Sequence, residues 1–66
     1  MDENSVWWAA NSLMRLYGPK AAAEATAMAD RLLVQKDSEG HALWLRISRA
    51  IHDLERRTAD VRELGL

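Results

Sequence analysis

Apolar residues between positions 5 and 17 recur every three or four residues, the spacing that places side chains on one side of an α-helix. We expect a helix over residues 5–17. Its core-facing stripe would contain Val6, Trp7, Ala10, Leu13, Met14 and Tyr17. Gly18 then favours the left-handed end of this helix, and Pro19 favours the first position of the next one.

A second helical pattern follows over residues 19–35 and is mostly alanine in its first half. Its apolar stripe would contain Ala21, Ala22, Ala25, Met28, Ala29, Leu32 and Leu33. Because alanine side chains are small, we expect a neighbouring helix to approach closely there.

The third pattern begins after "KDSEG" and extends over residues 38–63, with Asp37 or Ser38 as the N-terminal cap. Its apolar side would contain Leu43, Trp44, Ile47, Ala50, Ile51, Leu54, Thr58 and Val61. This helix would be ~39 Å long, whereas the second would be ~26 Å long. We therefore expect residues 55–66 either to fray or to lie against another molecule.

These patterns predict an all-α fold, a three-helix bundle-like domain with a long C-terminal helix that forms one domain over residues 1–66. The chain has 66 residues and no cysteine, so no disulfide stabilises its small core. Closely packed helices or self-association would have to stabilise it instead.

The net charge of −1 gives the chain no bulk attraction to nucleic acid or to an acidic membrane surface. The acidic start, "MDENSVWW", lacks the basic and long apolar regions of a signal peptide. No apolar run approaches the ~20 residues of a membrane span. We expect a cytoplasmic protein.

Catalytic and metal-binding signatures are absent from the sequence. The serines lack the local pattern of an activated nucleophile, and no glycine-rich phosphate loop occurs. His41 and His52 would lie ~16 Å apart along one helix, too far to share a metal, and we expect both at the surface. We therefore predict a non-enzymatic protein with no catalytic residue, no cofactor and no metal.

Three apolar residues, Trp8, Leu16 and Leu45, fall outside the faces that their helices need for a core. Buried aromatic and large apolar residues commonly anchor protein interfaces. We interpret these residues as an interface, most simply that of a symmetric homodimer, with another protein as the other candidate partner. The predicted function is a small interaction or self-associating module.

Polar recognition has several candidates. Asn11 and Arg15 lie one turn apart at the border of the first stripe. We expect them to bond to carbonyl groups at the C-terminal end of a neighbouring helix, with recognition of an acidic partner group as the alternative. Arginines on the outward side of the third helix suggest an alternative function, a nucleic-acid-associated regulator. These are Arg46, Arg49, Arg56 and Arg57. Asp53 lies among them, so we favour a solvated face over nucleic-acid binding.

The stretch "EGHALWLRISRAI" contains Gly40 in the first turn of the third helix, a position that lowers helix propensity. A close approach by a ligand and a close approach by a neighbouring helix both explain a glycine there. We favour packing for Gly40 and a core position for Trp44.

Three ordered patterns resemble a known family. They are "W-x-x-A-N-x-x-x-R-x-x-G" from Trp7 to Gly18, "A-x-x-x-A-D-x-L-L" from Ala25 to Leu33, and "D-x-E-G-x-x-x-W-x-R-I" from Asp37 to Ile47. This set is similar to a family of small helical proteins of alphaproteobacteria that is classed as a domain of unknown function. The resemblance implies a bacterial cytoplasmic protein and no particular activity, cofactor or catalytic residue. The family pattern ends near Leu54.

Overall fold

The computed structural model describes residues 3–63 and Gly65. These residues form three α-helices, α1 (Glu3–Tyr17), α2 (Ala21–Val34) and α3 (Ser38–Glu63), and a short 3-10 helix, η1 (Gly18–Lys20). The described part of the chain has no strand, so the predicted all-α class is confirmed.

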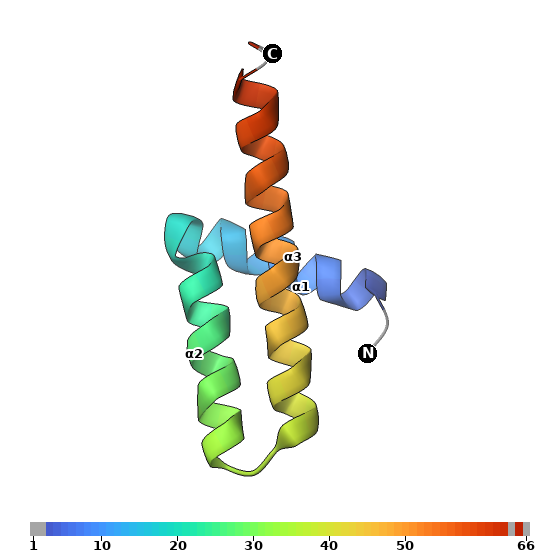
Figure 1. The fold of residues 1–66 in the computed structure, drawn as a ribbon, viewed down its shortest axis with the longest axis vertical. Coiled ribbons are helices and arrows are strands. Elements are labelled where there is room, and N and C mark those ends of the chain that lie inside the picture. The colour runs from blue at the N-terminus through green and yellow to red at the C-terminus, as the bar shows by residue number, and fades with distance from the viewer. Residues whose placement is uncertain (1–2, 64, 66) are drawn as a thin grey trace.

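The three helices do not lie along one another. Figure 1 shows α2 and α3 side by side and antiparallel, while α1 crosses behind them and α3 continues well beyond the crossing. The largest interface joins α2 and α3, and α1 packs against both. The predicted bundle-like arrangement is therefore replaced by a helical hairpin with a crossing helix.

The two turns follow from local chemistry. Gly18 has a φ of 56°, which confirms the left-handed conformation expected after the first helix. Pro19 lies in η1 rather than in the first turn of α2. At the second turn, Asp37 Oδ1 accepts a hydrogen bond from the Gly40 backbone N–H at 3.0 Å, so Asp37, and not Ser38, caps α3.

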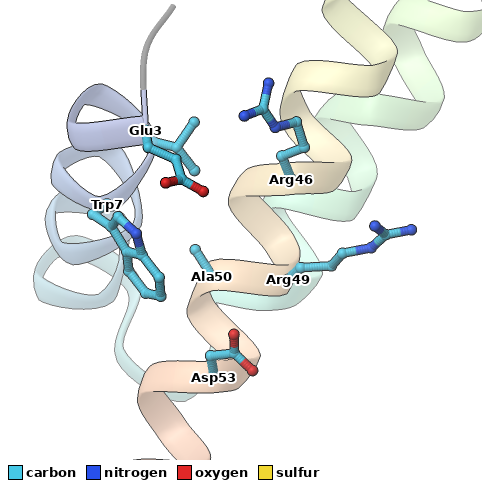
Figure 2. Close-up of a pocket in the computed structure, with 7 residues that line it drawn as sticks. Glu3, Trp7, Arg46, Arg49, Ala50 and Asp53 are labelled. Atoms are coloured by element: carbon cyan, nitrogen blue, oxygen red, sulfur yellow. The ribbon is translucent and has the colours of Figure 1, made fainter.

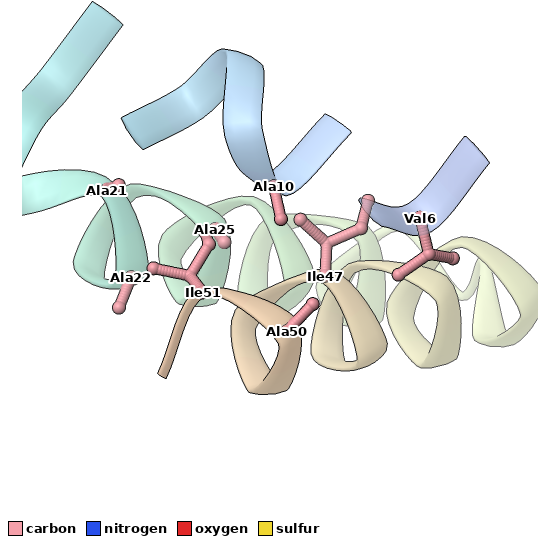
Figure 3. Packing of buried hydrophobic residues seen from close by; sticks show 8 residues of the cluster. All are labelled: Val6, Ala10, Ala21, Ala22, Ala25, Ile47, Ala50 and Ile51. Carbon is pink, nitrogen blue, oxygen red and sulfur yellow. The ribbon is translucent and has the colours of Figure 1, made fainter. Parts of the chain in front are cut away.

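The buried hydrophobic side chains in the described residues are small. They are Val6, Ala10, Ala21, Ala22, Ala25, Ala29, Ile47, Ala50 and Ile51. Only Ile47 and Ile51 are large and fully buried. Figure 3 shows Ile47 directed towards α1 and Ile51 directed towards Ala25 of α2. We call the six buried alanines and these two isoleucines the alanine core.

Four residues predicted in apolar stripes are exposed instead. Tyr17 is 45% exposed, Leu33 is 53% exposed and Val61 is 47% exposed. Thr58 is exposed as well, and its hydroxyl donates to the Leu54 carbonyl oxygen at 3.0 Å. All four lie towards the C-terminal ends of their helices.

Polar contacts support the close approach of α2 and α3. The Thr26 and Ser48 hydroxyl oxygens lie 3.1 Å apart. His41 is half-buried and its Nδ1 donates to the Ala29 carbonyl oxygen at 2.8 Å, which corrects the expectation of a surface histidine. His52 is exposed, as expected, with its Nδ1 3.8 Å from Glu55 Oε1.

Gly40 is a packing residue in this structure. A Cβ atom there would lie 3.1 Å from Leu32 Cδ1 and 2.6 Å from Asp37 Oδ2. A side chain would therefore press on α2 and displace the carboxylate that caps α3. Trp44 is half-buried and packs against the core, close to its predicted role.

The predicted tail, residues 55–66, is helical through Glu63, while residues 64 and 66 lie outside the described residues. Residues 56–61 are exposed. The tail contacts α1 within the same chain, because the Arg57 guanidinium lies 5.6 Å from the centre of the Trp7 ring. Arg57 is exposed, as predicted, and also contacts α1 through this ring.

The molecule is elongated. Its principal extents are 45 × 22 × 16 Å and its radius of gyration is 12.8 Å. A compact chain of this length would have a radius of gyration of about 11 Å. None of the described helices combines the length and the apolar character needed to cross a membrane.

Candidate functional site

A small hollow lies between the first two turns of α1 and the middle of α3 (Figure 2). Val6 and Ala50 provide apolar surface, and the Trp7 indole forms one wall. The other lining residues are Glu3, Arg46, Arg49 and Asp53. The cavity volume is about 180 Å³. We call this hollow the Trp7 pocket.

Of the four charged residues that line the Trp7 pocket, one carboxylate is in an ion pair with a described side chain and the other three charges are not. Asp53 Oδ1 accepts from Arg56 Nη2 at 2.7 Å, so a cation already balances this carboxylate. Arg46 and Arg49 are exposed and form no ion pair or hydrogen bond with the side chains that the structure describes. Glu3 provides the remaining carboxylate at the rim.

Trp7 joins the pocket to the far half of α3. One contact of its ring is the Arg57 guanidinium, 5.6 Å from the ring centre, a distance suited to a cation–π interaction. The periodicity of the sequence placed Trp7 in the core, but the side chain is only half-buried and packs at the core's edge. Glu3, one turn before Trp7, lies in α1, whereas the predicted helix began only at residue 5.

A second candidate site is the outer side of α1. Trp8 is 73% exposed and Leu16 is 76% exposed, in agreement with their predicted positions outside the core stripe. Ser12 lies between them in an i, i+4, i+8 row, and its hydroxyl donates to the Trp8 carbonyl oxygen at 2.9 Å. We call this row of three residues the Trp8 face.

The polar residues predicted beside this row do not contact a neighbouring helix. Asn11 Nδ2 donates to the Trp7 carbonyl oxygen at 2.9 Å, a bond within α1. The expected bond from Asn11 to another helix is therefore wrong. Arg15 is exposed and forms no ion pair or hydrogen bond with the side chains that the structure describes, so it remains available to an acidic partner group.

Leu45 does not belong to the Trp8 face. It lies on α3 and is half-buried rather than exposed. Leu45 is two residues before Ile47, whose side chain is directed towards α1. The Leu45 side chain therefore leaves α3 about 200° around the helix axis from that of Ile47. The structure therefore separates Leu45 from Trp8 and Leu16, and the predicted three-residue interface reduces to two residues.

No three His, Cys, Asp or Glu side chains among the residues placed by the structure gather closely enough to hold a metal ion. The Trp7 pocket is also smaller than the roughly 300–1,000 Å³ of typical small-molecule sites.

No family model matches this chain, and neither a curated protein nor a solved structure is significantly similar to it. The resemblance to small alphaproteobacterial helical proteins stays a prediction.

Proposed function

We propose that this chain is a small non-enzymatic module that self-associates, and that the second copy docks on the Trp8 face. The proposal rests on one observation: the buried core is built mainly of small side chains, whereas two large apolar side chains of α1 are exposed. Of the buried hydrophobic residues among those described, six are alanines, whereas Trp8 and Leu16 remain outside. A core of this kind leaves a 66-residue chain marginally stable, and association would add apolar burial.

The Trp8 face suits a symmetric pair. In a twofold interface, residue i contacts residue j of the partner and j contacts i. If the axis passes near Ser12 and the two copies of α1 run antiparallel, Trp8 of each copy lies opposite Leu16 of the other, because both are four residues from Ser12. Rows of i±4 residues pack against each other at a crossing angle of about 50°. The small Ser12 side chain at the centre would let the two helices approach.

Covering Ser12 at the centre of the Trp8 face leaves its donated hydrogen bond intact. The Ser12 hydroxyl already donates to the Trp8 carbonyl oxygen within α1. An unpaired buried polar donor would instead cost about 1–3 kcal/mol.

The test is sedimentation equilibrium on single variants and on a mixture of them. Trp8→Ala should weaken the dimer by about thirtyfold and Leu16→Ala by about tenfold. An equimolar mixture of the two variants should form a mixed dimer more tightly than either variant alone, since one Trp8–Leu16 contact is restored. Val34→Ala is the matched control, because Val34 is 83% exposed at the far end of α2.

A wild-type chain that sediments as a monomer at every concentration would refute self-association. A mixture that is no tighter than the single variants would refute the Trp8–Leu16 pairing.

The alternative, nucleic-acid association through the α3 arginines, has weaker support. Arg56 is paired with Asp53, and Arg57 lies over Trp7. Only Arg46 and Arg49 are left as free cations among the four. Measuring duplex binding at low and high salt would test this alternative, because phosphate contacts weaken steeply as salt rises.

A further inference from the structure

We propose that two copies of this chain exchange their third helices. The turn between α2 and α3, residues 35–37, would straighten, and α3 of each copy would pack on α2 of the other instead of folding back on its own α2 (Figure 1). The partner is a second copy, because it supplies the same α2–α3 contacts that one chain makes with itself. This exchange goes beyond the proposed pairing of Trp8 faces and does not rest on it.

The turn holds a residue in an unfavourable backbone conformation. Lys36 has a φ of 63° and is the only non-glycine residue in the described part of the chain with a positive φ. Glycine is the usual residue at this place after a helix, because a side chain strains the left-handed conformation. In a straightened turn Lys36 would adopt the ordinary right-handed helical conformation. Neither glycine nor proline occurs between Ala21 and Glu39 to interrupt such a helix.

Straightening the turn also conserves its backbone hydrogen bonds. The Lys36 N–H donates to the Leu33 carbonyl oxygen at 3.0 Å, and the Asp37 N–H donates to the Leu32 carbonyl oxygen at 2.9 Å. In a continuous α-helix the same two donors would bond to the same two acceptors with the partners interchanged, because each N–H donates to residue i−4. The Gly40 N–H, which Asp37 now caps, would donate to the Lys36 carbonyl oxygen.

The buried sides of α2 and α3 would be in phase on one continuous helix. Ala29 and Ile47 are both fully buried, and they lie 18 residues apart, which is five full turns. Leu33 follows Ala29 by four residues and would lie about 40° from the same line. A single apolar stripe would therefore run through the straightened turn. Two such helices packed antiparallel would cover Leu33, which is 53% exposed in the closed chain.

One residue opposes the exchange. The contacts of Thr26 with Ser48 and of Leu32 with the Gly40 position centre the hairpin on residues 36–37, so the twofold axis of an exchanged pair would pass there. Lys36 follows Ala29 by seven residues and would lie on the apolar stripe beside the other copy's Lys36. The short turn also holds α2 and α3 of one chain at an effective concentration on the order of 1 mM. We therefore expect the exchanged pair when the chain refolds at concentrations of that order.

The experiment uses two variants that carry one cysteine each, since the chain has none. The Thr26 and Ser48 hydroxyl oxygens lie 3.1 Å apart, so cysteines at these positions are close enough for a disulfide. Thr26→Cys and Ser48→Cys are unfolded in urea, mixed, refolded together and then mildly oxidised. Because this contact joins two molecules only after exchange, refolding at about 1 mM should give a covalent mixed dimer, identified by its mass.

The matched control replaces Thr26→Cys with Ala27→Cys. Ala27 is exposed and projects from α2 about 100° away from Thr26, so it does not face Ser48. The control mixture should give at least about tenfold less mixed dimer. Refolding the Thr26→Cys and Ser48→Cys mixture at an about hundredfold lower concentration should also reduce the yield, because the closed chain then forms before two copies meet.

Two substitutions of Lys36, each made in both cysteine variants, should act in opposite directions. Lys36→Leu removes the repulsion at the axis and should raise the yield of mixed dimer at least about tenfold. Lys36→Gly relieves the strain of the closed turn and weakens a continuous helix, so it should lower the yield at least about tenfold. Trp8→Ala should leave the yield unchanged.

Three results would overturn the exchange. These are a yield at about 1 mM no higher than that of the Ala27→Cys control, a higher yield from Lys36→Gly than from Lys36→Leu, and loss of the mixed dimer in Trp8→Ala. The last result would assign the cross-link to the Trp8 faces. A monomeric wild type at low concentration would refute only the pairing of Trp8 faces, so the two proposals fail separately.

Discussion

The alanine core and the Trp8 face use apolar residues in opposite ways. In the core, small side chains let α2 and α3 approach closely, and only Ile47 and Ile51 contribute large fully buried groups. On the Trp8 face, large side chains remain in water on a helix whose other side is packed. Close approach of helices therefore determines the fold of the chain, while the large apolar side chains of Trp8 and Leu16 stay at its surface.

The largest expected difference between the two regions is in stability. Ile51 is fully buried, so Ile51→Ala should lower the free energy of unfolding by about 3 kcal/mol through lost burial and a cavity. Trp8→Ala should change it by less than about 0.5 kcal/mol at concentrations where the chain is monomeric. Urea unfolding followed by circular dichroism measures both values.

Equal losses from Ile51→Ala and Trp8→Ala in the dilute monomer would contradict this comparison. Trp8 would then be part of the intramolecular fold rather than a surface left for a partner.

A smaller effect tests the close approach within the core. Ala25 is fully buried, so Ala25→Leu should overpack the core and cost about 1–3 kcal/mol. Ala27 is exposed on the same helix, and Ala27→Leu should change stability by no more than about 0.5 kcal/mol. The same urea titration compares the pair. If Ala25→Leu were as stable as Ala27→Leu, the core would have room that the structure does not give it.

Much of the fold follows from the sequence. The helical class, the left-handed Gly18 and the bounds of the third helix, 38–63, agree with the expectations from periodicity and capping residues. Periodicity gives the direction in which a side chain points, because the helix repeats every 3.6 residues. It therefore placed Trp8 and Leu16 outside the core correctly.

The remaining differences between prediction and structure concern how far neighbouring helices bury each side chain. Tyr17 and Leu33 belong to the predicted core stripes by periodicity, but both are exposed. Leu45 points away from Ile47 and is nevertheless half-buried. The crossing of α1 behind the hairpin brings Glu3 and Trp7 to Arg46 and Arg49. No local pattern encodes that crossing, so the Trp7 pocket could not be predicted.

A single cysteine on the proposed twofold axis tests the pairing of the Trp8 faces most directly. The chain has no cysteine, so Ser12→Cys introduces the only thiol. A disulfide requires Cα atoms about 4.4–6.8 Å apart. Under mild oxidation, Ser12→Cys should give a covalent dimer of twice 7.5 kDa on a non-reducing gel, much faster than Ala23→Cys on the exposed side of α2. Cross-linking of Ser12→Cys that is no faster than that of Ala23→Cys would contradict the account.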